Sequence, residues 1–199
     1  MKSENKYIGD DKFIKFLQHY SCPASLELVK MRFAGAICSP NPDLRPTDVI
    51  SSFWPDNLTP RLETKAEADL FFKFFMGLWD EMFERVCTNN LELPRISPQD
   101  DLADMCQKRR EIIEFGFLEG FFGGLENVKI PAFIAEIADS LSSLGELYAK
   151  LGQKIASGKE RQKIFDAILE CDKTALKSMS FIIEHYALPH INDLRRTIN

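Results

Sequence analysis

The side chains that most often perform acid–base catalysis or bind metal ions are scarce in this chain. It has three histidines, His19, His185 and His190. None of them follows an acidic residue by three positions, which excludes the Glu-x-x-His pairs of ferritin-like di-iron bundles, and no His-Glu-x-x-His motif occurs. His185 and His190 are separated by Pro189 and have a poor spacing for two ligands on one helix. We therefore expect structural or surface histidines and no metal site.

The cysteines also lack a functional spacing. They are odd in number, lie far apart and form no Cys-x-x-Cys pair; they are Cys22, Cys38, Cys87, Cys106 and Cys171. This pattern predicts neither a disulfide framework nor a zinc-binding motif. A catalytic thiol needs an electropositive and partly exposed setting, whereas Cys38 and Cys106 stand among apolar or mixed helical residues. We expect five free thiols and no catalytic cysteine.

Motifs for phosphate binding and nucleophilic catalysis are missing as well. The chain has no Gly-x-Gly-x-x-Gly and no Gly-x-Ser-x-Gly sequence. Gly158 and Lys159 have no glycine upstream at the phosphate-loop spacing, and they follow a predicted helix where a strand is required. Because no catalytic set is assembled in the sequence, we expect a protein that is not an enzyme and that carries no cofactor.

Composition restricts the partners and the compartment. The 199 residues carry a formal net charge of −5, and 45% of them are hydrophobic, so one domain with a sizeable core is expected. A net negative chain is a poor match for nucleic acid or for an anionic membrane surface. The most apolar run, 70–79, contains Lys73 and is shorter than the roughly 20 residues of a membrane span. With no apolar stretch of a secretory signal near its start, we expect a cytoplasmic protein without membrane insertion.

The hydrophobic pattern predicts helices along nearly the whole chain. Apolar residues at three- and four-residue spacing indicate helices over 10–20 and 26–38. The second is apolar almost all round, so we expect it at the centre of the fold, and a proline-rich turn ends it. A short helix over 48–54 should follow, capped by Thr47 and stopped by Pro55.

Two further helices have clear start signals. Thr64 and Glu67 form a capping box before a helix over 65–87. Ser97, followed by a proline at the first helical position, predicts another helix that runs to the glycine pair at 123–124.

The remainder of the chain is also predicted to be helical. Pro131 should open a helix that reaches about residue 155, and a last helical region should be interrupted at Asp172 and Pro189. No alternating β-branched run bounded by turn residues occurs, so no strand is expected. The predicted fold class is all-α, a multihelical irregular bundle that forms a single domain over 1–199.

Two apolar stripes are expected to face each other in the core. They consist of Phe71, Phe74, Phe75 and Leu78 on one helix, and of Leu26, Val29 and Phe33 on another. We expect Phe74 to be buried there, so that its truncation to alanine destabilises the fold strongly.

Small and acidic residues mark the helix that follows Ser97. Gly116 and Gly120 lie four positions apart and should share one helix face, which favours close helix packing; a ligand approaching the backbone is the alternative. The acidic residues Asp100, Asp101 and Asp104 fall in its first turns, where carboxylates interact favourably with the helix dipole. Asp104 and Lys108 have the spacing of a helical ion pair. We expect a solvated face, with a recessed cation site as the alternative.

A resemblance to a known family covers residues 25–122. The small-residue helix end "AGAIC" (34–38), the proline-rich turn, a short helix with Trp54, and "AEADLFFKFFMGLWDEM" (66–82) resemble the YecA/YgfB-like family of uncharacterised bacterial helical proteins. Met105 stands where that family usually has a tryptophan, and "GFL" lies further along than in the family. The resemblance implies a multihelical fold and a bacterial source, and it supplies no agreed catalytic residues. The Cys/His zinc motif of longer members has no counterpart here. The proline-rich corner is then architecture, with Trp54 filling a gap between helices.

The sequence favours a non-catalytic helical adaptor or regulatory protein. Its partner is another protein or a second copy of the chain, as in a homodimer. The alternative is an enzyme with an unrecognised, hydrolytic site built from histidines and acidic residues that only folding brings together. Exposed aromatic patches mark partner sites, and the residues predicted to bind the partner are Phe115, Phe117, Phe121 and Phe122.

Overall fold

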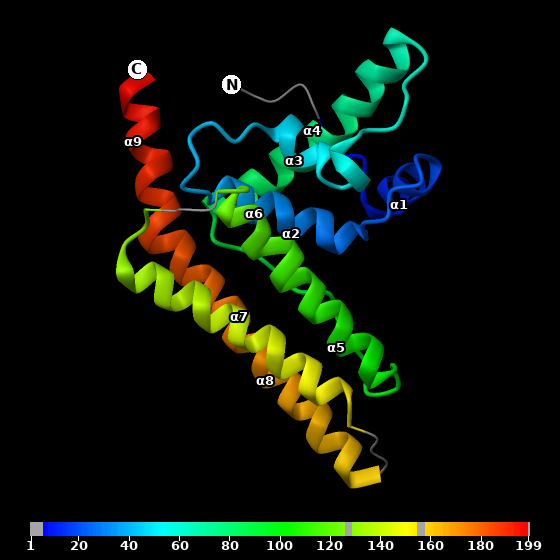
Figure 1. The fold of residues 1–199 in the computed structure, drawn as a ribbon, viewed down its shortest axis with the longest axis vertical. Helices are drawn as coiled ribbons and strands as arrows, with labels where there is room; N and C mark the ends of the chain where they lie inside the picture. Colours follow the sequence, from blue (N-terminus) through cyan, green and yellow to red (C-terminus); the bar gives the residue numbers. More distant parts are fainter. Residues whose placement is uncertain (1–5, 126–128, 155–157, 199) are drawn as a thin grey trace.

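The computed structural model describes residues 6–125, 129–154 and 158–198, with side chains as far as Asp193, and this described part contains helices and no strand. The predicted all-α fold class is therefore confirmed (Figure 1). In chain order the helices are α1 (Asp10–His19), α2 (Leu26–Ile37), α3 (Pro46–Ser51), η1 (Pro55–Asn57), α4 (Lys65–Cys87), α5 (Leu102–Glu111), η2 (Ile112–Leu118), α6 (Glu119–Phe122), α7 (Ala132–Gly152), α8 (Gly158–Ile182), η3 (Ile183–Ala187) and α9 (Leu188–Ile198).

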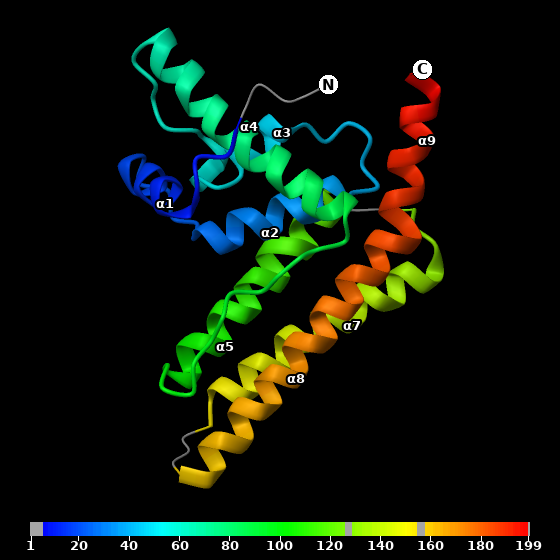
Figure 2. The same cartoon turned by 180° about the vertical axis from the view of Figure 1, so that it is seen from behind.

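Helix α2 lies at the centre of the N-terminal half. Helices α1, α3 and α4 pack against it, and so does the continuous helix made of α5, the π-helix η2 and α6, which crosses it (Figure 2). Every residue from Met31 to Ala36 is buried. This burial confirms that the helix with apolar residues almost all round is central.

Aromatic rings join α4 to α2. The ring centroid of Phe75 lies 6.2 Å from that of Phe33, and Phe71 and Phe75 are fully buried. The two predicted stripes therefore face each other. Phe74 is the exception, because it lies beside the buried stripe and is only half-buried. Its ring centroid lies 5.2 Å from that of Phe16 in α1. The expectation that Phe74 is a core residue is wrong.

The proline-rich corner after α2 is filled by Trp54. The buried indole lies 5.8 Å from the Phe71 ring and donates its Nε1–H to the backbone oxygen of Tyr20 at 3.1 Å. This confirms an architectural role for the residue. Helix α3 begins earlier than predicted, since Pro46 occupies its first position and Arg45, instead of Thr47, is the N-cap.

Helix α5 begins later than predicted. Its N-cap is Asp101, whose carboxylate accepts from the Asp104 N–H at 2.8 Å. Ser97 lies in a preceding turn, where its N–H donates to Asp100 Oδ2 at 2.8 Å. The predicted start at Ser97 is wrong because a short acidic side chain closes a local turn that competes with the helix.

Helices α7 and α8 form an antiparallel hairpin, and α8 continues through the π-helix η3 into α9 (Figure 1). The predicted end of α7 near residue 155 lies outside the described residues. No break occurs at Asp172, which is buried inside α8. Pro189 does not end the helix either. In η3 the Leu188 N–H donates to the oxygen of Ile183, five residues back. This wider, π-helical turn directly precedes Pro189, which has no N–H to donate.

Glycines allow the crossing of α2 with the helix α5–η2–α6. A Cβ atom at Gly35 would overlap the backbone oxygen of Phe117, and one at Gly120 would overlap that of Arg32. A Cβ atom at Gly116 would lie 3.0 Å from that of Met31. The predicted role of Gly116 and Gly120 in close helix packing is confirmed.

Candidate functional site

The connection between α4 and α5, residues 88–101, lies along α8; we call it the crossing segment. Near its start, Asn89 Nδ2 donates to Ser180 Oγ at 2.6 Å. Near its end, the Arg161 guanidinium donates to the backbone oxygen of Pro98 at 3.1 and 3.2 Å. The start of the crossing segment therefore lies beside the C-terminal part of α8 and its end beside the N-terminal part, so the two run antiparallel.

A buried ion pair fixes the middle of the crossing segment. Arg109 of α5 donates from Nε to both carboxylate oxygens of Asp172 of α8, at 2.9 and 3.1 Å, and from Nη2 to Oδ2 at 2.9 Å. Tyr148 of α7 donates its hydroxyl hydrogen to Oδ1 at 2.7 Å. Arg109 Nη2 also donates to the backbone oxygen of Pro94. Both charged residues are buried, so this network joins three helices and the segment by charge-assisted bonds.

Burial keeps the nearby phenol and thiols in their neutral forms. It raises the pKa of Tyr148, together with the charge of Asp172 and the bond to it. Burial, with smaller electrostatic contributions from Cys171 and Asp172, raises the pKa of the Cys106 thiol to about 11. Burial also raises the pKa of Cys38, which lies outside this network at the end of α2. All five cysteines are free thiols. A raised pKa is the opposite of what an activated thiol requires.

Two adjoining pockets open beside the crossing segment. Their volumes are about 260 and 450 Å³, and they share Glu27, Pro94 and Arg95. Together they form one elongated groove between α2, α5 and the crossing segment, with α4 and the start of α1 at one end. We call it the acidic groove, since eight carboxylates and five cationic groups line it; they are Asp10, Glu27, Glu81, Glu92, Asp100, Asp101, Asp104 and Glu111, with Lys30, Arg85, Arg95, Lys108 and Arg109.

Ion pairs inside the groove involve most of its cations. Arg85 Nε lies 3.0 Å from Glu81, and Lys108 Nζ lies 2.8 Å from Asp104, which confirms the pair predicted there. The predicted acidic cluster, Asp100, Asp101 and Asp104, lines the groove, and all three side chains are exposed. Among the described residues no group of three or more His, Cys, Asp or Glu side chains is placed to bind a metal ion.

A hydrogen-bonded cluster closes the end of the groove near α1. Asp10 accepts from Tyr7 at 2.7 Å and from Lys30 Nζ at 2.8 Å to each oxygen. Burial alone would raise the pKa of Asp10, but the bonds from Lys30 and Tyr7 outweigh it and lower that pKa. Burial and the bond to Asp10 raise the pKa of Tyr7. The cluster therefore contains an ionised carboxylate and a neutral phenol at neutral pH.

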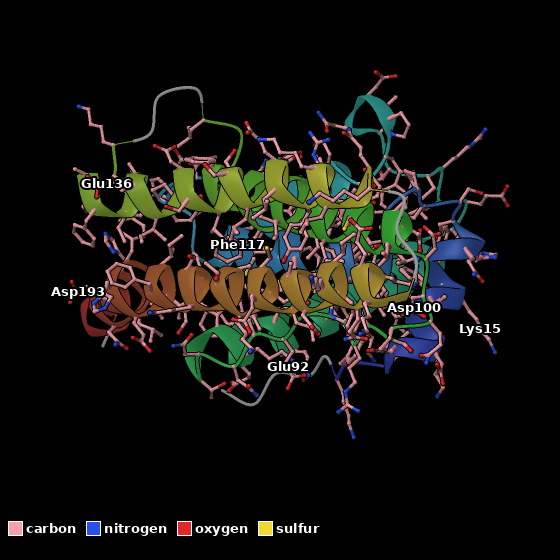
Figure 3. The ribbon with its side chains drawn as sticks, turned by 90° about the horizontal axis from the view of Figure 1, so that it is seen from below. Lys15, Glu92, Asp100, Phe117, Glu136 and Asp193 are labelled. Atoms are coloured by element: carbon pink, nitrogen blue, oxygen red, sulfur yellow. The ribbon has the colours of Figure 1, made fainter. Side chains whose placement is uncertain are left out.

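The four phenylalanines predicted to bind a partner do not form one surface. Phe117 and Phe121 are fully buried, and Figure 3 shows Phe117 in the middle of the molecule. The Phe121 ring lies 5.9 Å from that of Tyr186 in η3. The prediction is wrong for these two, because the helix they belong to lies between α2 and the C-terminal helices and needs apolar side chains on two faces. Phe122 is half-buried, and Phe115 is 47% exposed.

The histidines are not gathered into a site. His19 is exposed on α1, whereas His185 and His190 belong to η3 and α9, away from α1 (Figure 1). The ring centroid of His185 lies 4.2 Å from that of Phe181, and His190 Nδ1 lies 2.7 Å from the backbone oxygen of Tyr186. The structure thus does not bring His19 together with the other two.

Comparisons of the chain with families of known proteins, with curated proteins and with solved structures found no match. The resemblance to the YecA/YgfB-like family stays a prediction from sequence motifs. No helix in the described part of the chain combines the length and the apolar composition that a bilayer crossing requires.

Proposed function

We propose that this protein is a non-catalytic adaptor that binds an extended, positively charged segment of another protein in the acidic groove. The observation that carries the proposal is the groove lining, in which carboxylates exceed cationic groups by three. Complementary charge steers association and selects the partner. Two adjoining compartments suit successive side chains of an extended chain better than one compact ligand.

Rigid walls support the same function. The crossing segment is bonded at Asn89, Pro94 and Pro98 to side chains of α5 and α8. A site whose walls are already ordered loses little conformational entropy when a partner binds. An extended partner segment therefore meets a preformed surface.

The chemistry of the groove favours binding over catalysis. No histidine is among the described residues that line either pocket. Lys30, Arg85 and Lys108 are paired with carboxylates, and burial raises the pKa of the nearby thiols of Cys106 and Cys171. Free thiols stay reduced in the cytoplasm, which is the compartment that we propose.

Site-specific cross-linking tests the proposal. A photo-reactive amino acid in place of Arg95, which lies where the two pockets meet, should cross-link a partner in cells. Glu27→Lys should abolish this cross-link because it reverses a charge that both pockets share. The matched control is Glu136→Lys, the same change at an exposed position of α7 (Figure 3), and it should leave the cross-link intact.

The mass and sequence of the cross-linked product identify the occupant. A product with a lysine- or arginine-rich peptide supports the proposal, and a product with a second copy of the chain identifies a homodimer instead. Equal cross-linking in Glu27→Lys and Glu136→Lys proteins would refute binding in the acidic groove.

A further inference from the structure

Arg32 is a charged residue that the helix crossing buries almost completely, leaving 7% of it exposed. Its Nε donates to the backbone oxygen of Phe115 at 2.7 Å, and its Nη1 donates to Ser52 Oγ at 2.9 Å. Its Nη2 lies 2.8 Å from Glu119 Oε2. The guanidinium carbon also lies 5.7 Å from the centroid of the Phe53 ring. These contacts fix the guanidinium in one orientation.

The π-helix η2 provides one of these acceptors. In an α-helix the Glu119 N–H would donate to the oxygen of Phe115, four residues back. Here it donates to the oxygens of Glu114 and Gly116, and the Phe115 oxygen accepts from Arg32 instead. Single π-helical turns inside α-helices often occur at functional sites. The local helix geometry is thus linked to the placement of a buried cation.

A pocket of about 540 Å³ opens beside Arg32. Residues of α3 and η1, among them Ser51 and Asn57, line one side, and α6 with the glycine pair after it lines the other. A Cβ atom at Gly124 would meet nothing within 4 Å, so the wall there is open. The volume is typical of small-molecule sites. The pocket shares no lining residue with the acidic groove.

Glu119 is the exposed partner of a buried cation. Its side chain is 48% exposed, against 8% for that of Arg32. The other carboxylate that lines the pocket, Asp48, is bonded to the Arg45 guanidinium at 3.0 and 3.1 Å. Glu119 therefore lies at the mouth of the pocket, on the face of Arg32 that a ligand would reach.

The guanidinium depends on an adjacent anion. Burial lowers the pKa of Arg32, and the charge and hydrogen bond of Glu119 counteract that effect. A guanidinium carries five N–H donors, of which the described residues accept from three. The other two donors, together with the one now directed at Glu119, are available to an anion that takes the place of Glu119.

We propose that this pocket binds a small organic carboxylate, whose carboxylate group replaces that of Glu119 on Arg32. Since one carboxylate replaces another, the buried guanidinium stays paired throughout, and no uncompensated charge is left inside the protein. The planar guanidinium suits bidentate binding of a carboxylate. Ser51 and Asn57 contact the polar groups of the ligand, and Leu44 and Val49 contact its apolar part.

Removing the internal competitor tests the proposal. The probes are sodium succinate, citrate and N-acetylglycine, with sodium phosphate and sodium chloride at the same ionic strength for comparison. Glu119→Gln should lower the melting temperature in chloride, because it leaves Arg32 without its anion, and a carboxylate probe should restore it. Calorimetry should show an affinity about tenfold higher for Glu119→Gln than for the unchanged chain.

Two controls locate the effect. Glu146→Gln removes an exposed carboxylate of α7 outside the pocket and should change neither stability nor affinity. Ser51→Ala alters the pocket wall without touching Arg32 and should weaken probe binding. A carboxylate probe should also shift the Nε–H resonance of Arg32 in ¹⁵N-arginine-labelled protein. The proposal would be overturned if the carboxylate probes raised the melting temperature of the Glu119→Gln protein no further than chloride does, or if phosphate raised it equally well. Equal probe affinity in the Glu119→Gln and Glu146→Gln proteins would overturn it too.

Discussion

Replacing Asp172 with asparagine should destabilise the fold more than any change on the surface. The substitution keeps the size of the side chain and removes the charge that accepts three bonds from Arg109. Arg109 then remains buried without a counter-ion, and breaking a buried pair in this way costs about 3 to 5 kcal/mol. For a chain of 199 residues, a loss of about 4 kcal/mol corresponds to a decrease of about 10 °C in the melting temperature.

Two comparison variants separate the charge from the hydrogen bond. Tyr148→Phe removes one hydrogen bond to the carboxylate and should cost about 2 kcal/mol. The double change Arg109→Met with Asp172→Leu removes both charges, so it should cost less than Asp172→Asn alone. The residual cost comes from the backbone oxygen of Pro94, which loses its donor, and from the Tyr148 hydroxyl, which loses its acceptor.

Urea unfolding followed by far-UV circular dichroism measures each free energy. A loss below about 1 kcal/mol for Asp172→Asn would refute the reasoning, since it would mean that Arg109 reaches water or another anion. A double variant less stable than Asp172→Asn would refute it as well, because the buried charge would then not be the source of the cost.

Three further outcomes are expected. Gly35→Ala and Gly120→Ala should each cost at least about 2 kcal/mol in urea unfolding, and Gly116→Ala less, because the first two Cβ atoms overlap backbone oxygens; equal stability of all three would contradict the close crossing. Phe121→Ala should cost about 4 kcal/mol, whereas Phe115→Ala, at a ring that is 47% exposed, should cost less than about 1 kcal/mol by the same measurement. The free energy of unfolding should fall as the pH rises from about 9, the ordinary pKa of a thiol, towards the pKa of about 11 that burial gives Cys106. The folded thiol keeps its proton over that interval while the unfolded one loses it, so Cys106→Ala should show a smaller fall.

The helices could be predicted from the sequence because local signals determine them. Apolar periodicity and the Thr64 cap placed α4, and its N-cap bond from Glu67 N to Thr64 Oγ1 is present at 3.1 Å. The start of α5 was missed because several polar residues in a row offer alternative caps. Which of two apolar faces meets which neighbour was also missed, as at Phe117 and Phe121, because this depends on helices distant in the chain.

The buried ion pair was missed because its partners are 63 positions apart. A signal was present nonetheless. Arg109 stands three positions after Cys106 and three before Ile112, on an apolar face, and Asp172 stands on the same helix face as Ala175. A charge on the apolar face of one helix predicts an opposite charge on the apolar face of another. Arg32, within the central and largely apolar helix α2, gives the same signal for the pocket beside it.

The crossing segment, which forms one wall of the acidic groove, is attached to α8 by bonds between residues far apart in the chain. Asn89 bonds to Ser180, 91 positions further along, so this contact cannot form until the chain has been synthesised past α8. During synthesis the aromatic core of α1, α2 and α4 can assemble while α8 is still missing. The bonds that hold this wall of the acidic groove in place form only when α8 docks, so we expect a chain cut before α8 to leave the crossing segment unanchored.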